Sequence, residues 1–379
     1  MHQWAGLQVS LLLLVVLATG TFATVSPEID WLLHPAMRVE PRTAPTASWG
    51  RWLDAARRAA PDTRVETLDL PVTSAFTAEA VVVDDGGERR RVQIDPWSAR
   101  ATGVTPWLGA RRLLRDLHRH LMLPGWIGLP VVAILSLPLT AVLVTSFAIY
   151  KKWWRGFLRL PRRPRNFADR RRFVGDLHRW VGLWTLPFLA LIALTGGWYL
   201  TEWAGLEQPD PTPSATVAPT MIDGTRLDRV IAAAMRRVPA VRIRHVAFPD
   251  DGGILLAGQS DSWLVRDRAN AVLVDGVGAS VASIRGDMLS PGQRIAEAAD
   301  PLHFGDWGGT ASRWLWFILG LSLTTLAATG VLVFAMRSAR EEGSDLAIGR
   351  MAWRGMGYAA IPVVMVMGSA GHGLVAALT

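Results

Sequence analysis

Eight histidines are the residues best suited to chemistry in this 379-residue chain, which contains no cysteine. Without cysteine there are no disulfides, thiolate metal sites, iron–sulfur clusters or covalently attached c-type haem. A redox centre would therefore be held by histidine or without covalent bonds. Six histidines fall at or within apolar segments, where ionisable side chains are costly and tend to be functional: His2, His118, His120, His178, His303 and His372.

Two of these histidines begin nearly identical sequence segments. HQWAGL begins at His2 and HRWVGL begins at His178, and each starts an uncharged run that reaches a Thr-Gly pair 17 residues later. A repeated segment implies a pseudo-twofold axis, which brings equivalent positions face to face. His2 would then face His178 at one end of a helix bundle, and symmetry pairs His118 with His303 at the other end.

A pair of facing histidines matches what a six-coordinate b-type haem needs, namely neutral imidazole nitrogens above and below the iron in an apolar slot. Two such pairs predict two haems, one near each face of a membrane core about 30 Å thick. The alternative for any single histidine is an interfacial residue bonded to a carbonyl group. The Thr-Gly pairs, which include Thr329-Gly330, are expected to permit close helix approach or porphyrin clearance rather than chemistry.

The remaining histidines are less determined by their sequence context. His120 follows His118 by two residues, so the two point to different sides of a helix and only one can face the axis. His303 precedes the glycine-rich GDWGG, which predicts a loop there. His372 is flanked by small residues that allow close helix packing, so it is either a ligand or a packing residue. His34 and His245 are expected on a surface outside the membrane.

The elements that would position these histidines are membrane spans. Half of the residues are hydrophobic, and five windows free of Asp, Glu, Lys and Arg are long enough to cross a bilayer as helices. They cover residues 4–24, 121–150, 180–201, 314–336 and 355–379. The sequence therefore predicts an integral membrane α-helical bundle of five spans. A cleaved signal peptide is the alternative for the first window, although no Lys or Arg precedes it.

The orientation follows from one basic loop. Residues 151–177 carry ten Lys or Arg and two acids, a bias that keeps a short loop in the cytoplasm. A nucleic-acid patch is a poor alternative, because this loop connects two spans directly. We expect a multi-pass protein of the bacterial inner membrane, with a cytoplasmic amino terminus and large periplasmic domains.

Each of the two long segments between spans reads as a small α+β domain. A helix at 49–60 is stopped by Pro61 and followed by strands at 63–70, 80–83 and 90–94. The second segment repeats this order, with a helix at 227–238, Pro239 and strands at 241–248, 254–257, 262–266 and 271–274. The chain is thus expected to hold two parallel pseudo-repeats followed by one extra span. The expected boundaries are span 1 at 1–25, domain 1 at 26–116, span 2 at 117–150, basic loop at 151–177, span 3 at 178–203, domain 2 at 204–311, span 4 at 312–337, cytoplasmic loop at 338–354 and span 5 at 355–379.

Several motifs together resemble one known family. They are the HxWxGL segments followed by Thr-Gly, the IDPWSAR at 94–100, and the LHFGDWGGTASRWLWFILGLSLTTLAATGVLVF at 302–334. The chain resembles the PepSY-associated transmembrane family up to about Arg337. That resemblance implies two PepSY-like periplasmic domains and histidine-ligated haem b, and its LHR pattern favours His118 over His120 as a ligand. It also implies an inner-membrane reductase of ferric siderophores, which serves iron uptake.

The function predicted is an electron conduit, a probable oxidoreductase, that reduces a periplasmic acceptor, with a ferric siderophore favoured. The electron donor would be quinol or a separate cytoplasmic reductase, because the sequence has no nicotinamide-binding GxGxxG motif and no P-loop. The alternative is a membrane-anchored PepSY binding or regulatory protein without redox activity. A transporter ranks last, because no acidic residue lies within any of the five uncharged windows.

Overall fold

The computed structural model describes residues 9–149, 152–163, 167–217, 222–237, 240–341, 353 and 360–378. Their chain forms two compact units. The first, the membrane unit, contains residues 1–26, 112–207 and 302–379, and the second, the sheet unit, contains residues 27–111 and 208–301. His2 lies outside the described residues, so its predicted pairing with His178 stays a prediction.

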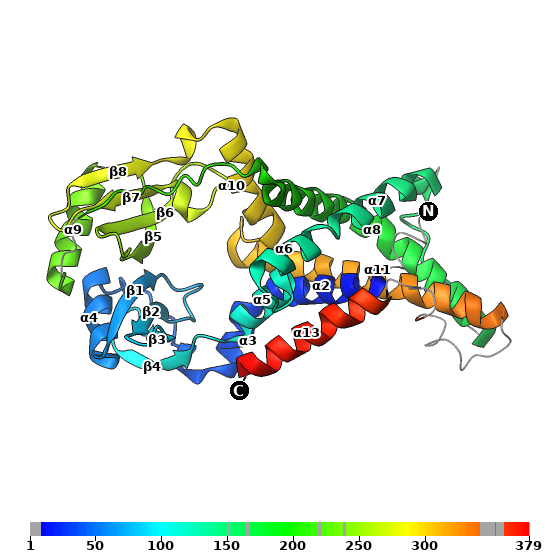
Figure 1. Cartoon of the computed structure of the whole chain (residues 1–379), viewed down its shortest axis with the longest axis horizontal. Coiled ribbons are helices and arrows are strands. Elements are labelled where there is room, and N and C mark those ends of the chain that lie inside the picture. The colour runs from blue at the N-terminus through cyan, green and yellow to red at the C-terminus, as the bar shows by residue number, and fades with distance from the viewer. Residues whose placement is uncertain are drawn as a thin grey trace. The chain divides into compact units, whose positions relative to one another are not determined.

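The membrane unit is helical throughout its described part (Figure 1). Its helix α11 packs against both α2 and α8, and α7 packs against α8. Leucine, valine and phenylalanine side chains from these helices fill one apolar core. The elements are α2 (Ser10–Ala23), α6 (Gly125–Ala133), α7 (Ser136–Ile149), η2 (Trp153–Arg155), α8 (Phe167–Thr201), η3 (Glu202–Leu206), α11 (Gly309–Glu341) and α13 (Ala360–Leu378), with the ends of α5 (Ala110–His120) and α10 (Pro291–Phe304).

Three stretches of the described residues are long and apolar enough to cross a membrane, at 125–148, 172–206 and 309–337. A fourth is formed if α2 and α3 (Ser26–Leu33), which bend by 67° at their junction, count as one span. These helices support the predicted membrane protein, whereas its five spans stay a prediction. The second span begins at Gly125 rather than at 117, because α5 ends at His120 and a short turn separates the two helices.

The sheet unit is built on one antiparallel sheet of eight strands, in the order β4-β3-β2-β1-β5-β6-β7-β8. Alternate strand residues such as Ala78, Ala80 and Val82 share a single core with side chains of the two long helices of this unit. The elements are η1 (Pro35–Met37), α4 (Trp49–Ala59), β1 (Thr63–Asp69), β2 (Ala78–Asp84), β3 (Arg89–Ile94), β4 (Ala101–Pro106), α9 (Gly224–Arg237), β5 (Arg242–Ala247), β6 (Ile254–Gln259), η4 (Asp267–Ala269), β7 (Ala271–Val274), β8 (Ser280–Ile284) and η5 (Gly286–Met288).

The two segments expected to form separate external domains meet in this one sheet. Strands β1 and β5 pair antiparallel, with Thr67 opposite Ala247 and Asp69 opposite His245. Each segment does contribute a helix and four strands, but the helix cores are also shared, since α4 and α9 pack together. The expectation of two independent small domains is corrected to one domain with two halves.

The contact between α4 and α9 joins the two halves of the sheet unit. Asp228 accepts a hydrogen bond from the backbone N–H of Gly50 at 2.8 Å, and Asp54 accepts one from the N–H of Gly224 at 3.0 Å. Each carboxylate therefore satisfies an N–H group at the start of the other helix. The two glycines let the backbones meet, because a Cβ on Gly50 would collide with the carbonyl oxygen of Gly224.

Most expected strands are confirmed within two residues, but one is wrong. Residues 262–266 form no strand, since Leu264 takes a left-handed φ of 55°. The strands β4 and β8, at the two edges of the sheet, were not expected from the sequence. The expected helix at 49–60 is confirmed as α4, and the one at 227–238 is confirmed as α9, which begins earlier at Gly224.

The glycine contact yields a stability prediction. Gly50→Ala forces α4 away from α9 and is expected to lower the free energy of unfolding of the sheet unit by about 1–3 kcal/mol. The measurement is chemical unfolding of the detergent-solubilised protein, followed by the far-ultraviolet signal. The control is Gly175→Ala in α8, where a Cβ meets nothing within 4 Å. Equal stability of the two variants would contradict the tight crossing.

The seam between β1 and β5 carries a pH-dependent contact. Nδ1 of His245 lies 2.7 Å from Oδ1 of Asp69. Burial lowers the pKa of His245, but its hydrogen bond to Asp69 and the charges of Asp69 and Asp267 outweigh burial and raise that pKa above its usual value. The contact therefore stabilises the fold fully below the unfolded pKa of about 6.5, and this stabilisation is lost as pH rises through the higher folded pKa.

The variant His245→Gln is expected to make the free energy of unfolding less dependent on pH. The wild-type protein should lose up to about 1 kcal/mol of stability between acidic and alkaline pH through this pair, a modest amount because both side chains are about one-third exposed. The measurement is the free energy of unfolding of both proteins across this range. An unchanged pH slope in the variant would show that the pair does not contribute.

Candidate functional site

His118 and His303 lie next to each other in the membrane unit, as symmetry predicts. Their ring centroids are 6.0 Å apart and the ring planes are inclined by 38°. His118 lies in the last turn of α5 and His303 in the last turn of α10. The expectation of a loop at His303 is therefore wrong, because α10 continues through Pro301 to Phe304 before the chain turns at Gly305.

His118 is fixed by the first apolar helix. Its Nδ1 lies 2.8 Å from the carbonyl oxygen of Val16 in α2. Gly20, one turn further along α2, lies beside the same ring, and a Cβ on Gly20 would come within 2.6 Å of Cε1 of His118. The glycine of the first Thr-Gly pair therefore makes room for the imidazole.

His303 is fixed by the corresponding pair on α8. Its Nδ1 lies 2.7 Å from the hydroxyl oxygen of Thr195. Tyr199, one turn further along α8, meets the His303 ring edge to face at 5.2 Å between centroids. Thr195, and Thr329 beside His178, are therefore functional candidates. The sequence predicted only that these residues permit close helix approach or leave room for a porphyrin. For Thr195, its place 17 residues after the histidine of an HxWxGL segment is the signal that could have identified it.

The hydrogen bonds define which nitrogen of each ring carries the proton. The carbonyl oxygen of Val16 can only accept, so Nδ1 of His118 donates. The hydroxyl of Thr195 already donates to the carbonyl oxygen of Leu191 at 2.9 Å, so Nδ1 of His303 donates to Thr195. In both neutral rings the lone pair is therefore on Nε2. This is the arrangement of metal-ligating histidines, whose other ring nitrogen donates to a protein oxygen.

His178 repeats this arrangement at a second place. Its Nδ1 lies 3.0 Å from the hydroxyl oxygen of Thr329 in α11, and that hydroxyl donates to the carbonyl oxygen of Thr325 at 2.8 Å. Nδ1 of His178 therefore donates as well, and Nε2 carries the lone pair. Gly330 lies beside the ring, since a Cβ there would be 3.3 Å from Cε1.

The other candidate histidines lie elsewhere. Nε2 of His120 is 3.4 Å from Oδ1 of Asp116 on the same helix, so His120 is turned toward its own helix rather than toward His303. His372 is exposed on α13. His34 and His245 belong to the sheet unit, where each lies beside an aspartate, Asp30 and Asp69 respectively. Among these, none joins the His118–His303 pair.

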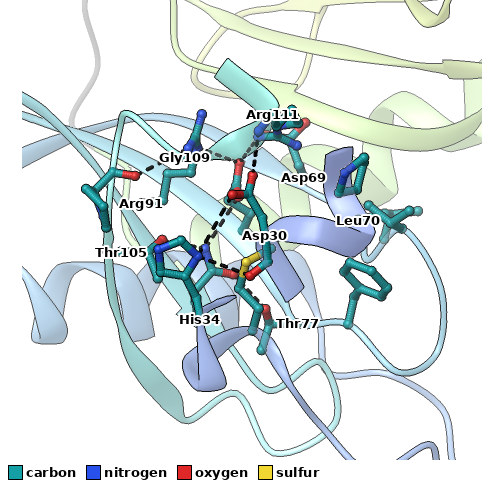
Figure 2. A pocket seen from close by; sticks show the side chains of 16 residues that line it. Asp30, His34, Asp69, Leu70, Thr77, Arg91, Thr105, Gly109 and Arg111 are labelled. Carbon is teal, nitrogen blue, oxygen red and sulfur yellow. Dashed lines mark hydrogen bonds and ion pairs between the residues drawn. The ribbon is translucent and has the colours of Figure 1, made fainter. Parts of the chain in front are cut away.

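A small pocket of the sheet unit holds the start of α5, the helix that bears His118 (Figure 2). Asp30, only 4% exposed, accepts hydrogen bonds from the backbone N–H groups of Ala110 and Arg111. The Arg111 side chain binds Glu79 at 2.7 Å, and Arg91 lies 3.3 Å from the same carboxylate. These charges satisfy one another, so the pocket positions a helix end rather than presenting open ligand groups.

The middle of α10 has a charged anchor of its own. Glu297, fully buried, accepts two hydrogen bonds from Arg266, at 2.7 and 2.9 Å, and one from Arg268 at 3.0 Å. Asp300 accepts a further bond from Arg266 at 2.6 Å. A paired and hydrogen-bonded carboxylate of this kind holds its geometry firmly. Buried carboxylates thus contact the start of α5 and the middle of α10.

The apolar helices and the antiparallel sheet define a membrane protein with a helical bundle and a separate sheet domain. Residues 1–337 match the PepSY-associated TM region, and the chain belongs to that family. It is also similar to the uncharacterized protein PA4219 of Pseudomonas aeruginosa, with 27% identity over 261 residues. This match covers 60% of the chain and 64% of the relative, so it spans less than two thirds of the relative's length.

The Thr195 hydrogen bond makes a prediction that needs no bound group. Thr195→Val keeps the shape of the side chain but leaves Nδ1–H of His303 without an acceptor, which is expected to cost about 1–3 kcal/mol of stability. Thr195→Ser should restore it. The measurement is unfolding in mixed micelles, with Thr325→Val as the matched control, because the exposed Thr325 hydroxyl bonds the carbonyl oxygen of its own helix at Leu321. Equal stability of both valine variants would contradict the assigned bond.

Proposed function

We propose that this protein is a haem b-containing electron conduit of the bacterial inner membrane that reduces a periplasmic acceptor, with a ferric siderophore as the favoured acceptor. The observation that supports it most is the His118–His303 pair. Two neutral imidazoles with Nε2 lone pairs, 6.0 Å apart between centroids, form the donor set of a bis-histidine haem site. Haem would supply reversible one-electron transfer.

The residues around the pair fit this role. Both rings are partly exposed, so part of their surface remains accessible to a ligand. Gly20 leaves space beside His118, and Tyr199 lies beside His303. Val16 and Thr195 fix the ring tautomers, and hydrogen bonds of this type orient ligands and raise their basicity. These residues would therefore hold two axial ligands in place before any group binds.

His178 supports a second site near the opposite end of the bundle. Thr195 and His178 are 17 residues apart on α8, which corresponds to roughly 25 Å along the helix. We expect His2 to complete this site by symmetry with His178. Two sites at this spacing would place one haem near each face of a membrane core about 30 Å thick.

The contacts of the Thr-Gly pairs favour the two parallel pseudo-repeats. His118 lies against the Thr-Gly pair on α2, and His303 lies against the Thr-Gly pair on α8. Helices α2 and α8 are far apart in the chain. The reciprocal contact of α4 with α9 follows the same relation. A twofold relation of this kind places one ligand from each repeat at the axis.

The orientation and the substrate complete the proposal. The basic residues 151–177 place that loop in the cytoplasm, so the sheet unit would face the periplasm and meet the acceptor. Electrons would come from quinol or from a cytoplasmic reductase. Reduction would release iron from a siderophore, because ferrous iron binds hard oxygen ligands less tightly than ferric iron.

The test is the haem content of histidine variants. The wild-type protein, purified in detergent after growth with ample haem, is expected to hold about two haems per chain by pyridine haemochrome. His118→Ala and His303→Ala should each lose the same haem, so the double variant loses no more than either single variant. His178→Ala should lose the other haem, whereas His245→Gln should keep both.

Two results would contradict the proposal. One is a folded wild-type protein without a haem absorption band, which would favour a PepSY binding or regulatory protein. The other is retention of both haems in the His118→Ala and His303→Ala variants, which would place the ligands elsewhere.

A further inference from the structure

The segment at 152–163 differs in charge from every other part of the membrane unit. Its sequence, KWWRGFLRLPRR, contains five Lys or Arg and no acid. All five cations are exposed: Lys152, Arg155, Arg159, Arg162 and Arg163. Among the residues that the structure describes, no acidic side chain forms an ion pair with any of them. Within the described residues, this positive charge is therefore not neutralised by ion pairs.

Large apolar side chains alternate with these cations and are just as exposed. Trp154 is 57% exposed, Leu158 is 90% exposed and Leu160 is 72% exposed. A basic loop that only sets the orientation of the protein in the membrane needs its charges but no exposed leucines. Cations interleaved with Trp and Leu are instead typical of segments that lie at a membrane surface, with the apolar side chains in the acyl boundary.

The packing of the segment places it at the depth of the lipid headgroups. Nε1 of Trp180 and Nε1 of Trp184 both donate to the carbonyl oxygen of Phe157, at 3.0 and 3.3 Å. The Phe157 ring meets Trp184 edge to face at 5.1 Å. From Trp180 to Thr201, α8 rises by about 31 Å, which is one hydrocarbon thickness. Phe157 is thus held at the boundary where tryptophan side chains and phosphate groups meet.

We propose that residues 152–163 form a binding site for anionic phospholipid headgroups. The arginines would bind the phosphate oxygens by charge-assisted hydrogen bonds, and Leu158 and Leu160 would lie among the acyl chains. The anchoring of Phe157 to α8 keeps the segment in the membrane plane, so it does not need to order on binding. This site does not require haem, because its charges, its exposed leucines and its anchor to α8 belong to residues 152–163 and to Trp180 and Trp184.

The experiment is native mass spectrometry of the full chain in mild detergent, with added cardiolipin or phosphatidylcholine. The wild-type protein is expected to bind cardiolipin at least about tenfold more tightly than phosphatidylcholine. The variant R155Q/R159Q/R162Q/R163Q should lose this preference. The single variant R159Q should lower cardiolipin affinity by up to about fivefold, which keeps the test valid if the fourfold variant does not fold.

The matched control removes the same charge from the sheet unit. R58Q/R100Q/R229Q/R236Q replaces four exposed arginines there and should bind cardiolipin like the wild type. The variant L158N/L160N should weaken cardiolipin binding although it keeps every charge. Equal loss in the fourfold variant and its control would overturn the proposal, as would displacement of cardiolipin by inorganic pyrophosphate at comparable concentration, since a bare phosphate site would need no leucines.

Discussion

A polar ring placed among apolar helices must have its N–H group hydrogen-bonded, and this constraint organises the membrane unit. An unsatisfied buried donor costs about 1–3 kcal/mol, and no water in a bilayer core can replace the missing partner. His118, His178 and His303 each meet the constraint with Nδ1, through Val16, Thr329 and Thr195 respectively. Satisfying Nδ1 leaves Nε2 with a lone pair in every case, so the same hydrogen bonds that permit burial also prepare the rings as ligands.

The helices that carry His118 and His303 also have buried carboxylate contacts. Asp30 binds the first N–H groups of α5, and Glu297 in the middle of α10 is bound by Arg266 and Arg268. Near its end, each of these two helices is bonded to an apolar helix, α5 through His118 and α10 through His303. The reciprocal contacts of α4 with α9 then join the two halves of the sheet into one body.

Much of this architecture could be predicted from local sequence. The elements that could not be predicted have a physical cause in common. Uncharged runs predicted the spans, and apolar alternation predicted strands such as β2 and β7. The edge strand β8, SVASI, has small residues and an exposed face, so its alternation is weak. Residues 262–266 contain Trp, Leu and Val, typical of a strand, but Leu264 turns the chain and Arg266 binds Glu297. The pairing of β1 with β5 depends on segments far apart in the chain, which no local pattern reports.

The candidate site, too, could be predicted from the sequence only in part. Symmetry alone paired His118 with His303, because both stand at the same end of equivalent predicted spans, the second and the fourth. The hydroxyl of Thr195 was not expected to bond His303, because its effect depends on the rotation of α8 about its own axis. The contact of His120 with Asp116 on the same helix favours His118 as the ligand candidate, which stays a prediction.

The most direct measurement of the central claim is an anomalous difference map at the iron edge, from crystals of the protein purified with its native cofactor. We expect an iron peak between His118 and His303, bonded to Nε2 of both rings, with Nδ1 of each still directed at Val16 and Thr195. An iron peak away from this pair, or none in a map that resolves both histidine rings, would contradict the claim that these two residues are the axial ligands of one haem.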